Sequence, residues 1–436
     1  MGNLVLLATL VALAILAYIR KKDMVSCTFI ATTMFSVSAT VVLVNENNWN
    51  QHISTNTVVI ILTALIAVLI GEILGERIHV SVLPIKPNGK YANCREIRNN
   101  GGNATTLLLS SIMIIILIFY IRYLSRVVVS AGFAGGIFSI MSNIKVASMV
   151  DDPVQMGSLL SQAYQLMKCI GYYYIYLYIY NIVYKNRKAL NLYLLPSLLF
   201  LFSTLLSPGR QGLIKVFIYA FIVFAITYEK KEGKSFRIKP KTISIVALLF
   251  VLLIILVRWL SVLRNSDVNI ASYFSVYLGG SIVSFDKYVN GFAKTSDNPE
   301  NFRAIASYLT AFGFNIPPVT YNFEPIYWYS STGELLMTNI FTAFRRYIHD
   351  FGFAGLYIIC GSIGAIYSSA YKRIRKGMVS HAGIAFFASC LYPIVNFVFE
   401  ESFLNEVLSI NTVLNLIYIY ILFRYFTTYS DSIEEA

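Results

Sequence analysis

The residues of this chain with the clearest chemical potential are Arg345, Arg346, His349 and Asp350, which directly precede an apolar run that starts at Phe351. If this stretch is helical, the four side chains share one broad face. A histidine near a carboxylate can act as a general base at neutral pH, and an arginine fork can hold a phosphate group. Of the four histidines, His349 alone has such neighbours. The alternative is an Arg346–Asp350 pair within the helix, with Arg345 facing lipid headgroups, although an exposed pair of this kind contributes only about 0.3–0.5 kcal/mol.

A second arginine lies in the turn SPGRQG at residues 207–212. Pro208 and Gly209 break the preceding helix, and Arg210 sits near the start of the next one. A helix N-terminus presents free N–H groups and a positive dipole end, which attract phosphate. Arg210 is therefore a candidate phosphate ligand. The alternative is an arginine that only reaches a lipid headgroup.

The elements that position these residues are apolar helices. The chain has 436 residues, of which 57% are hydrophobic and 13% charged, and a mean hydropathy of +0.64. A helix needs about 20 apolar residues to cross the hydrocarbon core. The sequence predicts an all-α, polytopic membrane protein, a single integral membrane domain over residues 1–436, with about 11 (10–12) transmembrane helices. The candidate runs are 4–19, 26–44, 57–74, 104–121, 163–184, 189–206, 213–228, 243–257, 351–371, 382–399 and 407–425.

The charge distribution predicts the orientation of these helices. Basic residues 20–22 follow the first apolar run, so this run is a first helix and not a cleavable signal peptide. When residues 20–22 are placed in the cytoplasm and the sides alternate, the excess of basic residues collects on the inside. The N-terminus is then outside and the C-terminus cytoplasmic. The net charge of +13 thus reflects topology, and nucleic-acid binding is not expected. The five cysteines form no CxxC pair, and no metal site is predicted.

Polarity concentrates in two long outside segments, residues 122–162 and residues 258–350, the second of which precedes the third-last helix. A channel or carrier usually has polar groups deep within its helices, whereas these apolar runs contain few charged residues. The pattern favours an enzyme whose site faces outward. Within the larger segment, residues 273–292 have the apolar spacing of an amphipathic helix that lies on the membrane or caps the bundle.

The same segment carries four weaker candidate residues for binding a glycan, Tyr327, Trp328, Asp286 and Glu324. Aromatic rings stack on the faces of sugars. However, tyrosine and tryptophan are also enriched at every membrane interface, and this interfacial interpretation is the stronger one for the two aromatic residues.

Two arginine sites and a general base, with no cofactor, suit one class of reaction at the outer face of a membrane. A lipid-linked pyrophosphate leaving group develops charge that arginines can stabilise without a metal. A sugar hydroxyl that attacks as the nucleophile needs a base within hydrogen-bond distance.

The chain also resembles the O-antigen/oligosaccharide repeat-unit polymerase (Wzy) family of bacterial cell envelopes. The resemblance rests on the number of helices, the large late outside loop, and the motifs SPGRQG, YFSVYLGGSIVSFDKYV and TNIFTAFRRYIHDFGFAG. It implies an enzyme of the bacterial inner membrane that transfers a glycan from undecaprenyl pyrophosphate onto another lipid-linked repeat unit. It also implies that Arg210, Arg345 and Arg346 hold pyrophosphate and that His349 or Asp350 activates the acceptor hydroxyl. Expected partners are membrane lipids, a chain-length regulator and a flippase. The sequence does not identify the sugar of the repeat unit.

Three alternatives share parts of this pattern. An O-antigen ligase has the same layout with a different acceptor. A glycosyltransferase that uses lipid-phosphate sugars usually carries acidic residues in its first outside loop, where this chain offers Glu46 alone. A polysaccharide or glycolipid transporter needs charged residues within its helices, and the nearest candidates, Glu72, Lys168 and Lys215, lie close to helix ends.

Overall fold

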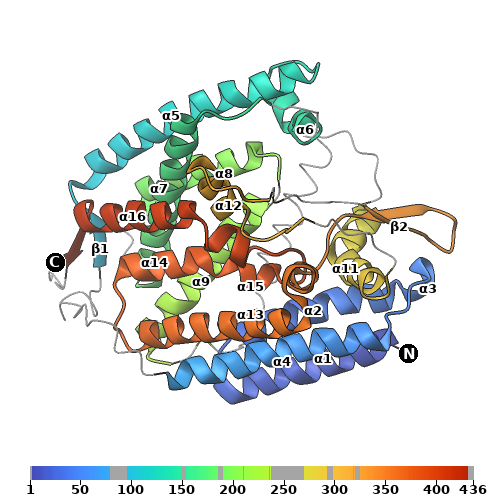
Figure 1. Ribbon diagram of the computed structural model, residues 1–436. Coiled ribbons are helices and arrows are strands. Elements are labelled where there is room, and N and C mark those ends of the chain that lie inside the picture. The colour runs from blue at the N-terminus through green and yellow to red at the C-terminus, as the bar shows by residue number, and fades with distance from the viewer. Residues whose placement is uncertain are drawn as a thin grey trace. The chain divides into compact units, whose positions relative to one another are not determined.

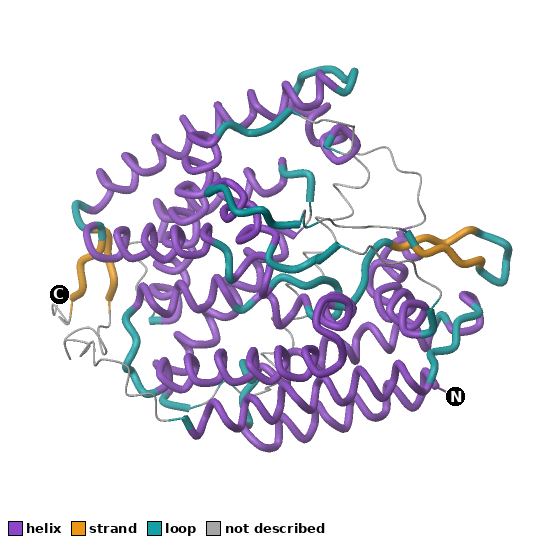
Figure 2. Tube along the Cα trace, in the orientation of Figure 1, coloured by secondary structure: helices purple, strands orange, loops and turns teal. Residues whose placement is uncertain are grey.

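The computed structural model describes residues 2–78, 96–148, 154–184, 190–209, 211–234, 236, 270–291, 298–317, 319 and 325–430. The described chain is mostly helical, with two short antiparallel strand pairs (Figures 1 and 2). It divides into two compact units. Unit 1 comprises Met1–Val82, Val268–Arg373 and Cys390–Thr412, and unit 2 comprises Leu83–Asp267, Ile374–Ser389 and Val413–Ala436.

Six helices of the described chain are long and apolar enough to cross a membrane, as expected for a helical membrane protein. They are α1 (Gly2–Lys21), α2 (Cys27–Val44), α4 (Thr55–Arg77), α5 (Gly102–Ser130), α9 (Gln211–Glu232) and α13 (Ala343–Arg375). The predicted count of eleven is not confirmed. The predicted run at 243–257 lies outside the described residues.

The remaining predicted runs form helices of a different kind. Three are too short for a full span: α8 (Leu190–Leu206), α16 (Ile410–Tyr425), and the run at 382–399, which splits into α14 (His381–Cys390) and α15 (Tyr392–Asn396). The fourth, α7 (Ser158–Val183), is long but rich in tyrosine, which lowers its hydropathy. The break before α15 has a local cause, because Pro393 cannot donate a backbone hydrogen bond to a continuing helix.

Unit 1 is built around membrane-length helices whose backbones approach closely. α1, α4 and α13 run side by side (Figure 1). Gly71 of α4 meets Gly361 of α13, and a Cβ added at Gly71 would lie 1.8 Å from the Gly361 carbonyl oxygen. Gly75 meets Ala365 in the same way one turn later. Small residues at such positions let membrane helices pack at short range by van der Waals contact.

The predicted amphipathic helix is present as α11 (Ile270–Val289) and packs against α2 and α4. Ser38 Oγ of α2 donates to the Leu278 carbonyl at 2.6 Å, and Gly279 faces Trp49 of the short helix α3 (Glu46–Trp49). The strands β2 (Ile326–Tyr329) and β3 (Leu335–Thr338) form a hairpin in which Tyr327 lies opposite Met337. α11 also contacts β3. The described part of the predicted loop 258–350 is therefore folded around this helix.

A buried carboxylate and its basic partner mark one end of unit 1. At this end, Glu72 of α4 is fully buried and accepts from Ser26 Oγ at 2.7 Å and from Lys21. Tyr371, near the end of α13, donates to Asp23 at 2.8 Å. At the other end, Asn3 of α1 bonds to Ile53 in the loop before α4. Lys372, near the end of α13, donates to the Glu76 carbonyl at the first end, so the start of α13 points away from it. Phe344 in the first turn of α13 stacks on Phe35, midway along α2, with 5.1 Å between the ring centroids.

Unit 2 contains α5 to α9, α14, α16 and a two-stranded sheet. β1 (Glu96–Asn99) pairs with β4 (Thr427–Ser430), and the buried hydroxyl of Tyr173 on α7 donates to Asn99 Oδ1 at 2.6 Å. α5 continues beyond Arg122 to Ser130, and α6 (Ile137–Ala147) follows it. The predicted outside segment 122–162 is thus helical over much of its described length.

Candidate functional site

The candidate cluster lies on the first two turns of α13, which a glycine separates from the rest of the helix. Gly352 has φ 66° and ψ −171°, so the helix kinks there. Positive φ favours glycine because it has no Cβ. The segment before the kink is held by a hydrogen bond from the Ala343 backbone N–H to the Phe397 carbonyl at 2.8 Å. A short helical segment at the start of this membrane-length helix therefore carries the four candidate residues Arg345, Arg346, His349 and Asp350.

Both arginines are buried and ion-paired with Glu300, a residue that the sequence reasoning had not selected. The Arg345 side chain is 4% exposed and Glu300 is fully buried. Arg345 Nη2 contacts Glu300 Oε2, and Arg346 Nε lies 3.5 Å from the same oxygen. Arg346 Nη2 also pairs with Glu400 at 3.2 Å. A buried charge that loses its partner is strongly unfavourable, so this pairing fixes both guanidinium groups.

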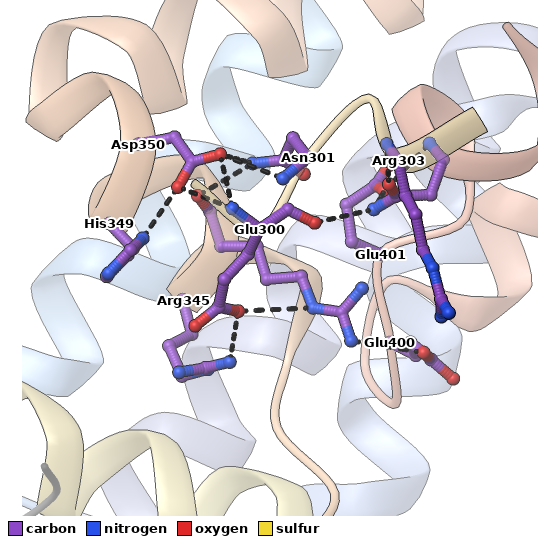
Figure 3. Close-up of polar contacts among 10 residues, drawn as sticks. Glu300, Asn301, Arg303, Arg345, His349, Asp350, Glu400 and Glu401 are labelled. Carbon is purple, nitrogen blue, oxygen red and sulfur yellow. Dashed lines mark hydrogen bonds and ion pairs between the residues drawn. The ribbon is translucent and has the colours of Figure 1, made fainter. Parts of the chain in front are cut away.

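His349 and Asp350 form a direct contact. His349 Nδ1 lies 2.6 Å from Asp350 Oδ1, and the two side chains are only 11% and 6% exposed. Asp350 also accepts from the backbone N–H and the side-chain Nδ2 of Asn301, at 2.9 and 2.8 Å, and from the Glu300 N–H. Figure 3 shows His349 and Asp350 meeting beside the Glu300–Asn301 segment. An ionised Asp350 favours the imidazole tautomer with its proton on Nδ1, which leaves Nε2 as the basic nitrogen.

This arrangement differs from the simple helix pair considered above. Asp350 is engaged by His349, Asn301 and the Glu300 backbone, while Arg346 is paired with Glu300 and Glu400. A carboxylate partner is not unique to His349 among the histidines. His52 also has a carboxylate partner, Glu46, at 2.8 Å, but its side chain is 66% exposed.

A second buried carboxyl group supports the cluster from the chain that follows α15. Glu401 Oε1 accepts from the Tyr347 hydroxyl at 3.2 Å and from the Leu404 N–H at 2.6 Å. Glu401 Oε2 accepts from Asn405 Nδ2 at 2.7 Å, and the same Nδ2 donates to the Glu300 carbonyl at 3.3 Å. Asn405 lies in the π-helical turn η2 (Phe403–Val407), which contacts α12 (Arg303–Ala311). The sequence carries one signal for this support, the acidic pair Glu400–Glu401 directly after an apolar run.

Burial raises the pKa of Glu401 above its ordinary value, against the lowering effects of its hydrogen bonds and of Arg346. The protonated, neutral form is therefore favoured more strongly in the folded protein than in the unfolded chain.

Glu401→Gln is expected to flatten the pH dependence of stability. Because the folded pKa is raised, the stabilisation from the protonated group is complete below the unfolded pKa of about 4.3 and is lost as pH rises through the folded pKa. The melting temperature of the wild type should fall as the pH rises through this range, whereas that of the permanently neutral variant should fall less. Melting curves in detergent from about pH 4 to about pH 8 measure this difference. Glu334→Gln, on the exposed hairpin turn, is the control, and equal slopes for Glu401→Gln and wild type would contradict the assignment.

The other predicted site residues have separate environments. Asp286 accepts from the N–H and Oγ of Ser54 at 2.8 and 2.7 Å, at the start of α4. On the hairpin, Tyr327 is 51% exposed, whereas Trp328 is 4% exposed and meets the edge of Trp49. Glu324 and Arg210 lie outside the described residues.

The turn before α9 agrees with its predicted form in the residues that are described. α8 ends at Leu206, Ser207 Oγ donates to the Gly209 carbonyl at 2.9 Å, and α9 begins at Gln211. This turn belongs to unit 2, whereas the His349 cluster belongs to unit 1.

Across the described residues, no group of three or more histidine, cysteine, aspartate or glutamate side chains is arranged to hold a metal ion. No protein-family model matches the chain, and neither a curated protein nor a solved structure is significantly similar to it.

Proposed function

We propose that this chain is a membrane glycosyltransferase that polymerises lipid-linked oligosaccharide repeat units, taking the growing glycan from undecaprenyl pyrophosphate. The observation that carries the proposal is the contact between His349 and Asp350, 2.6 Å apart at the mouth of a membrane-length helix. Arg345 and Arg346 lie on the same short helical segment. A general base and two cations at a membrane boundary are the groups that transfer from a lipid pyrophosphate requires.

In the proposed reaction, His349 removes the proton from an acceptor hydroxyl as its oxygen attacks the anomeric carbon of the donor glycan. The bond from that carbon to the pyrophosphate oxygen breaks, and undecaprenyl pyrophosphate leaves with the bonding electrons. Asp350 orients the imidazole and stabilises the imidazolium that forms. The proton then passes to solvent.

The two arginines have different roles in this proposal. Arg345 is ion-paired with the fully buried Glu300, so its role in this proposal is to hold the local structure. Arg346 pairs with Glu400, whose side chain is 30% exposed. A pyrophosphate that enters from solvent can displace the Glu400 carboxylate and take its place on Arg346 as a bidentate ligand. Arg346 is therefore the arginine that contacts the leaving group.

The proposed orientation places the site at the outer face of the bacterial inner membrane. Arg20 and Lys21 lie at the end of α1, and Arg77 lies at the end of α4. The end of α13 lies at the same basic end, where Lys372 donates to the Glu76 carbonyl, so the site at the start of α13 lies away from that end. By the positive-inside rule, the basic end faces the cytoplasm, which puts the N-terminus outside. The cytoplasmic C-terminus in this proposal comes from alternating the predicted spans along the chain.

Deletion of the encoding gene is expected to remove long surface glycan chains while single-repeat caps remain. This result follows because a polymerase is needed only to join one repeat unit to the next. A glycan ladder on a gel makes the measurement, with plasmid-borne wild type as the control. Loss of every cap would instead indicate a ligase, and loss of all surface repeats would indicate a flippase.

A proton-coupled carrier is the second candidate, and the buried carboxyl groups of Glu300 and Glu401 favour it. A buried carboxyl group with a raised pKa, such as Glu401, can bind and release a proton during transport. Liposomes distinguish the two functions. Polymer formation from lipid-linked repeat units without a pH gradient supports the enzyme, whereas gradient-driven movement of the glycolipid without polymer formation supports the carrier.

A further inference from the structure

Unit 2 contains a cavity of about 540 Å³ that is lined by basic residues. Its walls come from the last turn of α9, the residue after α7, and residues 374–377, all within this unit. The basic lining residues are Lys230, Lys231, Arg375 and Lys376, and the acidic one is Glu229. The volume lies in the range of sites that bind small molecules.

Two of the four cations have structural partners. Arg375 Nε pairs with Glu229 Oε1 at 2.7 Å, and Lys231 Nζ donates to the Val183 carbonyl at the end of α7, at 2.7 Å. Basic residues at helix C-termini complement the negative end of the helix dipole and favour the cytoplasmic side of a membrane. These effects account for Arg375 and Lys231.

Lys230 shares the helix-end position of Lys231, but it differs from both residues in its contacts. This side chain is half-buried in the cavity wall, and the described part of the chain gives it no opposite charge or hydrogen-bond partner. An ammonium group that is withdrawn from water without a counter-charge is unfavourable. With Glu229 engaged by Arg375, the cavity retains an excess of positive charge.

We propose that this cavity binds a phosphoryl group, with the Lys230 ammonium as its main ligand and Lys376 at its rim. Phosphate oxygens accept strong charge-assisted hydrogen bonds from lysine. α9 is a membrane-length helix and Lys230 lies in its last turn, so the cavity lies at the depth of lipid headgroups. An anionic phospholipid headgroup and a soluble phosphate are thus two sources of the same ligand chemistry. The proposal is independent of the glycosyltransferase site in unit 1.

The test is binding to the purified full-length protein in detergent, with three probes. These are inorganic phosphate, short-chain phosphatidylglycerol and chain-matched phosphatidylcholine. Anionic probes should bind wild type and raise its melting temperature, and Lys230→Gln should weaken this binding about tenfold or more. Lys234→Gln, an exposed lysine outside the cavity lining, should bind as wild type does.

Each outcome separates the alternatives. Binding of phosphatidylglycerol alone identifies a lipid headgroup, and binding of inorganic phosphate as well identifies a free phosphoryl ligand. Without ligand, Lys230→Gln should melt no lower than wild type, because it removes a charge that has no partner. Lys376→Gln serves as a second cavity variant if Lys230→Gln does not fold. Equal affinities in the cavity variants and Lys234→Gln, or no preference for anionic over zwitterionic probes, would overturn the proposal.

Discussion

Arg345→Ala should destabilise unit 1 by about 3–5 kcal/mol, because it leaves the buried Glu300 carboxylate short of its closest cation. Glu300 is fully buried, and its remaining contact with Arg346 is 3.5 Å long. Thermal or denaturant unfolding in detergent measures the loss. A variant that melts like wild type would show that the ion pair is not buried.

Two further variants make this expectation specific. Arg303→Ala changes an exposed arginine on α12 and should have a much smaller effect. The double variant Arg345→Met/Glu300→Gln removes both charges and should recover most of the lost stability. It also tests the role of Arg345 in the proposed reaction. A stable double variant that still makes polymer supports a structural role for Arg345, whereas a stable but inactive one shows that the Arg345–Glu300 pair is needed for the reaction itself.

The sequence predicts the local features of this site well. The adjacent residues His349 and Asp350 can meet without any tertiary information, and the apolar spacing of residues 273–292 was sufficient to predict α11. The break at Pro393 could also have been predicted, because a proline limits helix continuation. Because this proline was not taken as a break, the sequence prediction joined the two short helices α14 and α15 into one span.

The partners of the arginines could not be predicted in the same way. Glu300 lies 45 positions before Arg345 and meets it only through tertiary packing. The same is true of Asp286, whose bonds to Ser54 cross 232 positions. Trp328 is an intermediate case. In the strand β2, burial alternates, so Trp328 points inward and Tyr327 outward, but this follows only once residues 326–329 are recognised as a strand.

His349→Ala is expected to lower the polymerisation rate by about 10²–10⁴-fold, the usual contribution of a general base. Its stability should change little, because the imidazole is not the group that anchors the Glu300–Asn301 segment. Asp350→Asn should lower both rate and stability, since Asp350 accepts from Asn301 and from the Glu300 N–H. The measurement is polymer formation by purified protein in liposomes with lipid-linked repeat units, alongside melting temperatures.

His52→Ala is the matched control for this prediction. His52 also contacts a carboxylate, Glu46, at 2.8 Å, but it is largely exposed and has no arginine neighbour in its own stretch of sequence. A histidine–carboxylate pair that serves only local structure should behave alike at both positions. A large rate loss for His349→Ala with wild-type rates for His52→Ala therefore assigns the base to His349. Comparable rates for both variants and wild type would remove His349 from the reaction, and a rate that depends strictly on added magnesium or manganese would replace the arginine-based stabilisation of the leaving group with a metal.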